Sequence, residues 1–295
     1  MSLKEQLASG KFVVFAELQP PKGTRLIDLF EQAGRLKGRV DALYIPDLQN
    51  AIMRLGSLSV CTLLKARETE TIFTLSCGDR NRLALQSDLL NASALGLDNV
   101  LILQGDSPSI GDHYEAKPVF DLDVLGLLGA VKRLQEGYDL AGNELQGKPQ
   151  FCVGSQIRIR ATNQDMDFEV AEMEKKIGFG VDFFVTSPVY DAGLFETFIK
   201  KAASLKVPII AGVTLLKSVG MARYVNKHVE GALIPETDID KLMKTLDKRE
   251  ASVAIASETI RRLKPVCRGV QIIPIGWEQL IPTVLERAGL LSATG

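Results

Sequence analysis

The sequence Asn99-Val-Leu-Ile-Leu-Gln-Gly-Asp-Ser-Pro108 decides how the chain is organised. Its apolar run, Val100 to Leu103, predicts a strand buried on both faces, as strands of parallel sheets are. The strand stops at Gly105 and Asp106, and α/β folds place their sites at the carboxyl ends of such strands. Gly and Asp are also ordinary turn residues, so the stretch alone favours a plain strand-ending turn.

Seven further apolar segments share this character, and helical segments separate them. Eight alternating strand–helix units in a chain of 295 residues predict an α/β fold, a (β/α)8 TIM barrel that forms one domain over residues 1–295. Neither a GxGxxG fingerprint nor a P-loop follows any strand. The eight strands are expected at residues 12–18, 41–45, 71–77, 100–103, 151–156, 182–186, 208–215 and 269–275.

Composition excludes several classes of protein. A net charge of −1 with interspersed signs argues against a nucleic-acid partner. No apolar run reaches membrane-spanning length, and the first residues lack a signal-peptide core, so we expect a cytoplasmic protein. The four cysteines form no CxxC pair and only two histidines are present, so we expect neither disulfides nor a metal site.

Glu17 is the most informative residue at the predicted barrel mouth. It lies within Phe-Ala-Glu-Leu at the end of the first strand, where burial is expected to raise its pKa and suit it to general acid catalysis. The alternative is a buried ion pair between Glu17 and an arginine of the mouth. A pair of carboxylates, Glu17 and Asp106, also occurs in glycosidases, but 6% aromatic residues offer little for a sugar cleft.

Other polar residues follow the predicted strands. Cys77 ends the third strand, and no histidine is placed to activate it, which favours a core role. Arg158 and Arg160 alternate after the fifth strand. The pattern fits arginines that bind phosphate groups and arginines on a solvated surface equally well. From the residues alone, we infer a barrel with a buried acid that binds a large, flat, polar ligand.

Two segments at this spacing resemble signatures of one family. Phe-Ala-Glu-Leu-Gln-Pro-Pro, ending at Pro21, resembles the F-E-x-x-P-P start of methylenetetrahydrofolate reductases, and Leu103 to Pro108 resembles their L-x-G-D-x-P signature. Segments 47–54 and 77–82 resemble the bacterial and acetogen-type branch. The resemblance extends over nearly the whole chain.

The resemblance implies a flavin-containing barrel that reduces 5,10-methylenetetrahydrofolate to 5-methyltetrahydrofolate. It implies FAD as cofactor, with FMN as the alternative, and NADH or a partner protein as electron source. Glu17 matches the general acid that opens the methylene bridge, and Asp106 matches an aspartate beside flavin and folate. Both are expected to be catalytic. The cofactor site is expected at Cys77, Asp79, Arg80, Leu103, Gln104, Gly105, Asp106, Gln156, Arg158 and Lys176, and the substrate site at Glu17, Gln19, Asp106, Ser187 and Tyr224.

The sequence departs from the family pattern at two of these positions. Ser187 stands where relatives usually carry a folate-binding glutamine, and Gln104 replaces an arginine found in some of them. Two alternatives therefore stay open: a flavin- or pterin-binding subunit that works only with an electron-transfer partner, and a reductase of a related one-carbon pterin. We also expect an oligomer.

Overall fold

The structure of the chain, a computed structural model, describes residues 1–159, 162–229 and 231–291. Eight strands form a closed barrel in which each strand pairs in parallel with the next, and β8 pairs with β1. This topology confirms the (β/α)8 barrel predicted from the sequence. The strands are β1 (Val13–Glu17), β2 (Ala42–Ile45), β3 (Thr71–Ser76), β4 (Asn99–Leu103), β5 (Cys152–Ile157), β6 (Phe183–Pro188), β7 (Ile209–Thr214) and β8 (Gly269–Ile273).

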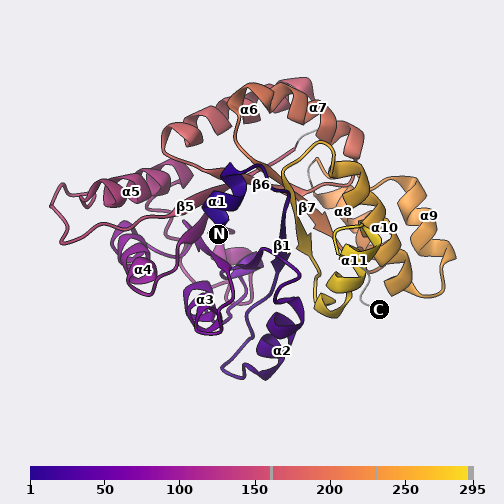
Figure 1. The fold of residues 1–295 in the computed structure, drawn as a ribbon, viewed down its shortest axis with the longest axis horizontal. Helices are drawn as coiled ribbons and strands as arrows, with labels where there is room; N and C mark the ends of the chain where they lie inside the picture. The colour runs from indigo at the N-terminus through magenta and orange to yellow at the C-terminus, as the bar shows by residue number, and fades with distance from the viewer. Residues whose placement is uncertain (160–161, 230, 292–295) are drawn as a thin grey trace.

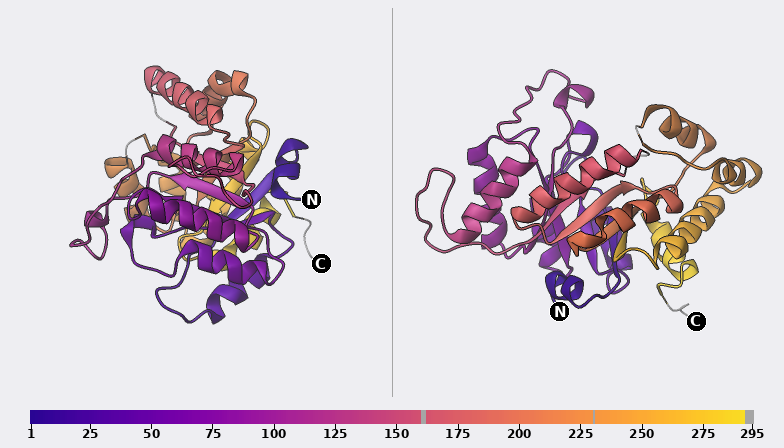
Figure 2. Two further views of the ribbon diagram at one scale, coloured as in Figure 1. Left: turned by 90° about the vertical axis from the view of Figure 1, so that its left-hand side faces the viewer. Right: turned by 90° about the horizontal axis from the view of Figure 1, so that it is seen from above.

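Helices surround the strands, and α9 lies farthest out, beyond α8 and α10 (Figure 1). Views at right angles show the helices on all sides of the barrel (Figure 2). None of the described helices is long and apolar enough to cross a membrane. The α-helices are α1 (Leu3–Ala8), α2 (Ile27–Leu36), α3 (Ser57–Lys65), α4 (Arg82–Ala94), α5 (Val124–Glu136), α6 (Asn163–Gly178), α7 (Ala192–Ala202), α8 (Val219–His228), α9 (Glu236–Lys244), α10 (Lys248–Leu263) and α11 (Ile281–Arg287). The short 3-10 helices are η1 (Gln49–Ala51), η2 (Pro108–Ile110), η3 (Ala203–Leu205) and η4 (Glu278–Leu280).

Several helices begin at side chains that cap their free backbone N–H groups. Asn81 accepts from two backbone N–H groups at the start of α4, and Asp191 and Asp247 do the same for α7 and α10. Asp123 accepts from the backbone of Gly126 at the start of α5. Such caps each contribute about 1 kcal/mol to helix stability. They fix where the chain leaves each loop at the barrel mouth.

The barrel interior is a separate apolar cluster from the larger core between strands and helices. Phe15 and Phe183 meet edge to face inside it, with ring centroids 5.9 Å apart. A Cβ on Gly154 would lie 2.4 Å from the Phe183 ring, so glycine on β5 leaves the space that this ring fills. The packed interior supports the strand ends from below, as in other (β/α)8 barrels.

Helix α1 closes the amino-terminal end of the barrel and was not expected from the sequence. Leu3 and Leu7 pack into the interior cluster, and Figure 1 shows α1 over the middle of the ring of strands. The helix is only six residues long, and a capping box between Ser2 and Glu5 starts it. That S-x-x-E pattern was the available sequence signal.

Candidate active site

Polar side chains gather at the end of the barrel where the strands terminate, the end that holds the site in (β/α)8 enzymes. Three connected groups lie there. The first is an acid with two amides on the β1 and β2 loops. The second is a charged network around one arginine after β3. The third is an aspartate on a tight turn after β4.

Glu17 ends β1 and is only 6% exposed. Burial raises its pKa to about 7, a hydrogen bond from Gln49 opposes this rise, and the charge of Glu278 adds to it. The expectation of a desolvated acid is therefore confirmed. The partner in the structure is an amide and not the arginine of the alternative interpretation, so Glu17 can exchange a proton near neutral pH.

The loop after β2 holds Gln49 against Glu17. The amide of Gln19 donates to Gln49 Oε1 at 3.5 Å, which leaves the Gln49 amide N–H groups for the carboxylate. Leu48, Asn50 and Ala51 adopt left-handed φ values of 44°, 57° and 54°. Such values are uncommon for residues other than glycine, and strained turns concentrate at functional sites.

A second buried carboxylate, Asp47, belongs to a charged network. Its Oδ2 lies 2.8 Å from Arg80 Nη1, and its Oδ1 accepts from the backbone of Ser57 at the start of α3. Arg80 also pairs with Asp79 at 3.1 Å and with Asp88 at 3.0 Å. Burial raises the pKa of Asp47, and the positive charge of Arg80 opposes this rise. Burial lowers the pKa of Arg80, but the three surrounding carboxylates outweigh burial, so the net shift is upward.

This network limits what Arg80 can do. Three carboxylates surround one guanidinium, so its donors are directed at the protein. The network ties the β2 loop to the start of α4, and Asp79 also accepts from Ser76 Oγ at 3.2 Å. We conclude that Arg80 positions loops of the mouth. Cofactor contact by Asp79 and Arg80 stays a prediction.

Asp106 lies on a tight turn after β4 and its side chain is exposed. Its Oδ2 accepts from the backbone N–H of Asn50 at 3.1 Å, which joins the β4 loop to the β2 loop. Gly105 has a φ of 75°, and a Cβ there would lie 2.8 Å from Ser76 Cβ. Glycine is therefore required here, because Ser76 already fills the space that a Cβ would take and other residues rarely adopt this φ.

Asp112 fastens the loop that follows. It forms an ion pair with Lys22 of the β1 loop, accepts from the Met53 backbone at 3.0 Å, and contacts His113 at 2.9 Å. These contacts hold the pKa of Asp112 well below its usual range, with Lys22 as the largest cause. Loops from β1, β2 and β4 thus form one connected rim.

Gln156, Arg158 and Lys176 form a separate group at β5 and α6. Lys176 Nζ donates to the Gln156 carbonyl at 2.9 Å. Burial is the largest cause of a lowered Lys176 pKa. The negative charges of Glu169 and Glu172 oppose this lowering, and the positive charge of Arg158 adds to it. Arg158 is exposed. Two cations within electrostatic reach of each other suit phosphate oxygens. Arg160 lies outside the described residues.

The remaining predicted residues are less closely connected. Cys77 is fully buried in the outer core, so its side chain packs as a small apolar group, and its contact with a cofactor stays a prediction. Leu103 packs against the interior cluster at the mouth, and Gln104 is exposed. Ser187 is half-buried on β6. Tyr224 is 63% exposed on α8 and stacks on His228.

Sequence reasoning gave no role to three polar residues of the mouth and barrel, although it placed Gln49 at the predicted mouth. Gln49 and Glu278 act directly on the pKa of Glu17. Gln271 on β8 is 4% exposed, lies in register with Phe15 and Gly212, and has a buried Oε1 without a hydrogen-bond partner among the described residues. The signal for Gln271 was a single amide within an otherwise apolar strand. An unpaired buried carbonyl accepts a donor from a ligand or water.

A family model described as methylenetetrahydrofolate reductase matches residues 2–289. Methylenetetrahydrofolate reductase 1 of Schizosaccharomyces pombe is 24% identical over 296 residues, covering 93% of this chain and 45% of that protein. A probable methylenetetrahydrofolate reductase (NADH) of Oryza sativa subsp. japonica is 24% identical over 227 residues, covering 72% and 36%. The chain spans less than half the length of these relatives.

Two solved structures share the fold. One is an uncharacterized protein from Clostridium thermocellum that binds two copies of 5-methyl-5,6,7,8-tetrahydrofolic acid. It matches with a TM-score of 0.69 and 18% identity over 97% of each chain. The Bacillus cereus spore cortex-lytic enzyme SleL matches with a TM-score of 0.53 and 14% identity, covering 94% of this chain and 75% of that one. At these identities the likeness concerns the fold alone.

Proposed function

The chain belongs to the methylenetetrahydrofolate reductase family, and we propose that it reduces 5,10-methylenetetrahydrofolate to 5-methyltetrahydrofolate at the mouth of the barrel. The observation that carries the proposal is Glu17, a buried carboxyl whose pKa lies at about 7. About half of such a group is protonated at neutral pH, so it can both deliver and recover a proton. Glu17 meets an amide and not a cation, which keeps that proton available.

Glu17 would act on the methylene bridge of the substrate. The carbon of this bridge joins two nitrogens, and breaking one C–N bond places an electron pair on the departing nitrogen. Protonation of that nitrogen by Glu17 lets it leave as a neutral amine. The remaining nitrogen and the bridge carbon then form a cationic iminium group, which accepts a hydride to become the methyl group. The burial of Glu17 thus serves the step that generates the electrophile.

The mouth offers features that fit a flavin. Gly105 forms a tight turn that packs against Ser76, and Leu103 provides an apolar contact from β4. Asp106 is fixed by the Asn50 backbone and remains exposed for a polar contact. We propose that these residues hold FAD, with FMN as the alternative, and that Arg158 and Lys176 meet its phosphates. A bound reduced flavin would supply the hydride.

The folate would lie between the acid and the proposed flavin site. Gln19 and Ser187 face the same mouth from β1 and β6, and we propose that they bind the pterin with Asp106. Serine offers one hydroxyl, whereas the glutamine side chain offers both a carbonyl acceptor and an NH2 donor. We therefore expect this contact to be weaker than in relatives that carry glutamine there. Tyr224 would contribute from α8.

An anaerobic half-reaction tests the proposal. The purified chain, loaded with FAD, is mixed with 5-methyltetrahydrofolate while the visible absorbance of the flavin is recorded. We expect bleaching, because the reaction run backwards passes a hydride from the methyl group to the flavin. Failure to bind either FAD or FMN, or a bound flavin that no folate bleaches, would contradict the proposal.

A second arm identifies the electron donor. NADH is added to the oxidised protein under the same conditions, with and without a candidate electron-transfer partner. Bleaching by NADH alone assigns a self-sufficient reductase. Bleaching by methyltetrahydrofolate but not by NADH assigns a subunit that receives electrons from a partner protein. Repeating the assay with other methylated pterins tests whether Ser187 marks a different substrate.

A further inference from the structure

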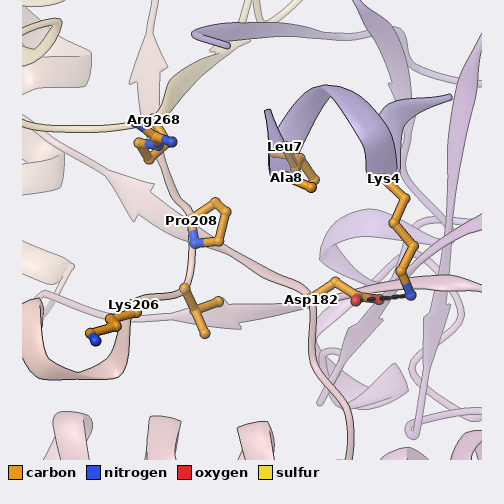
Figure 3. A pocket seen from close by; sticks show the side chains of 8 residues that line it. Lys4, Leu7, Ala8, Asp182, Lys206, Pro208 and Arg268 are labelled. Carbon is orange, nitrogen blue, oxygen red and sulfur yellow. Dashed lines mark hydrogen bonds and ion pairs between the residues drawn. The ribbon is translucent and has the colours of Figure 1, made fainter. Parts of the chain in front are cut away.

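A cavity of about 440 Å³ opens at the amino-terminal end of the barrel, opposite the mouth. One wall is α1, and the other consists of the residues that lead into β6, β7 and β8 (Figure 3). This end takes no part in the proposed reduction. The cavity is lined by Lys4, Leu7, Ala8, Asp182, Lys206, Val207, Pro208 and Arg268.

The charges of the cavity are unbalanced. Three cationic side chains, Lys4, Lys206 and Arg268, face one carboxylate, Asp182. Lys4 pairs with Asp182 at 3.0 Å, and Asp182 also accepts from the Val153 backbone at 2.8 Å. Asp182 is therefore already engaged. Among the described residues, the structure gives Lys206 and Arg268 no carboxylate partner, so the cavity carries a net positive charge.

Arg268 is held in place by the backbone. It lies between β7 and β1, where its N–H donates to the Ile209 carbonyl and its own carbonyl accepts from Val13 N, each at 3.0 Å. Its guanidinium lies over Gly10, where a Cβ would be 2.6 Å from Nη2. Gly10 has a φ of 83°, so glycine at this turn also leaves room for the guanidinium. Arg268 is exposed, and among the described residues the structure gives its guanidinium no acidic partner, so its N–H groups are available to donate to an oxyanion.

Two lysines complete the charged lining of the cavity. Figure 3 shows Lys4 extending from α1 to Asp182, with Arg268 above Pro208 and Lys206 below it. Lys206 is exposed, and its long flexible stem lets the ammonium group turn toward an anion. The apolar part of the lining, which includes Leu7 and Pro208, would contact the body of an organic anion.

We propose that this cavity binds a small molecule that carries two or more negative charges on phosphate or carboxylate groups. Arg268 and Lys206 bind the oxyanion, and Lys4 stays with Asp182 beside it. The bound anion would tie α1 to the strands that begin at β7 and β8. Since Leu3 and Leu7 of α1 close the barrel interior, occupancy would stabilise the folded chain.

Thermal unfolding in the presence of anions tests this site. Pyrophosphate and succinate are titrated separately at constant ionic strength, with sodium chloride as the balancing salt. We expect a saturable rise in Tm of about 2 °C or more for at least one of them. The anion with the lower midpoint concentration tells whether phosphate or carboxylate chemistry is preferred.

Matched variants locate the binding. The double variant Lys206→Gln, Arg268→Gln should require at least about tenfold more anion for the same rise in Tm, whereas Lys148→Gln should behave as the wild type. Lys148 is exposed and does not line the cavity. The proposal would be overturned if pyrophosphate and succinate raised Tm no more than sodium chloride does, or if they raised the Tm of the double variant as much as that of the wild type. The measurement needs neither flavin nor folate, so its outcome is independent of the reductase assay.

Discussion

Two buried carboxylates lie at neighbouring strand ends of the mouth and have different partners. Glu17 at the end of β1 is 6% exposed and meets the neutral amide of Gln49. Asp47 after β2 is 8% exposed and meets the guanidinium of Arg80. Burial raises the pKa of both, but only Asp47 has a cation that favours its charged form. The partner therefore separates an acid that can exchange a proton from one that holds loops together.

Replacing Glu17 should have the largest effect. Glu17→Gln keeps the size and the hydrogen bonding of the side chain but removes its proton-transfer chemistry. We expect folate turnover to fall by about 10²–10⁴-fold, the usual contribution of a general acid, with flavin binding retained. Steady-state turnover of the loaded protein measures this loss. Glu31→Gln, at an exposed glutamate of α2, is the matched control and should keep the wild-type rate. A wild-type rate in Glu17→Gln would remove Glu17 from the mechanism.

Glu17→Gln should also change how the stability of the protein depends on pH. The pKa of Glu17 rises from 4.5 to about 7 on folding, so the folded chain binds the extra proton between these values. Its contribution to stability is full below pH 4.5 and is lost as pH rises through 7. Glu17→Gln should therefore gain roughly 3 kcal/mol relative to wild type between pH 4.5 and 8. Urea unfolding of both proteins across this range measures the difference, and a constant difference would refute the raised pKa.

Removing the Arg80 cation that pairs with Asp47 should affect stability more than catalysis. Arg80→Met leaves a buried carboxylate without its cation, and we expect the free energy of unfolding to fall by roughly 3 kcal/mol, the lower end for a buried pair because Arg80 is partly exposed. Denaturant unfolding at neutral pH checks this loss. Arg82→Met removes the exposed pair with Asp121 and should change stability much less. Equal losses of stability in both variants would mean that the Arg80–Asp47 pair stabilises the fold no more than an exposed ion pair does.

Gln49 should fine-tune the acid. Its hydrogen bond opposes the rise in the Glu17 pKa, so Gln49→Leu should move that pKa upward, by roughly one unit. The shift appears as a displaced pH profile of turnover. Gln19→Leu removes only the neighbouring amide and should displace the profile less. A downward shift in Gln49→Leu would reverse the role assigned to this amide.

The sequence was sufficient for the barrel because buried parallel strands form apolar runs at regular intervals. It also predicted the burial of Glu17, since this acid lies within the apolar segment Phe-Ala-Glu-Leu. It could not identify the partner of Glu17. Gln49 reaches that acid through a loop with left-handed residues, and Arg80 reaches Asp47 across 33 positions of the chain. Such pairings depend on how the strands bring their loops together, which no local pattern records.

The proton of Glu17 is the centre of the account, and the pH dependence of the folate half-reaction tests it most directly. Single-turnover reoxidation of the reduced flavin by 5,10-methylenetetrahydrofolate is followed from pH 5 to 9 in wild type and Glu17→Gln. Opening of the methylene bridge needs the protonated carboxyl as acid and precedes hydride transfer, so the wild-type rate should be level below a pH of about 7 and fall as the pH rises above it. Glu17→Gln should be slow at every pH. The same pH profile and the same rates in both proteins would contradict the account.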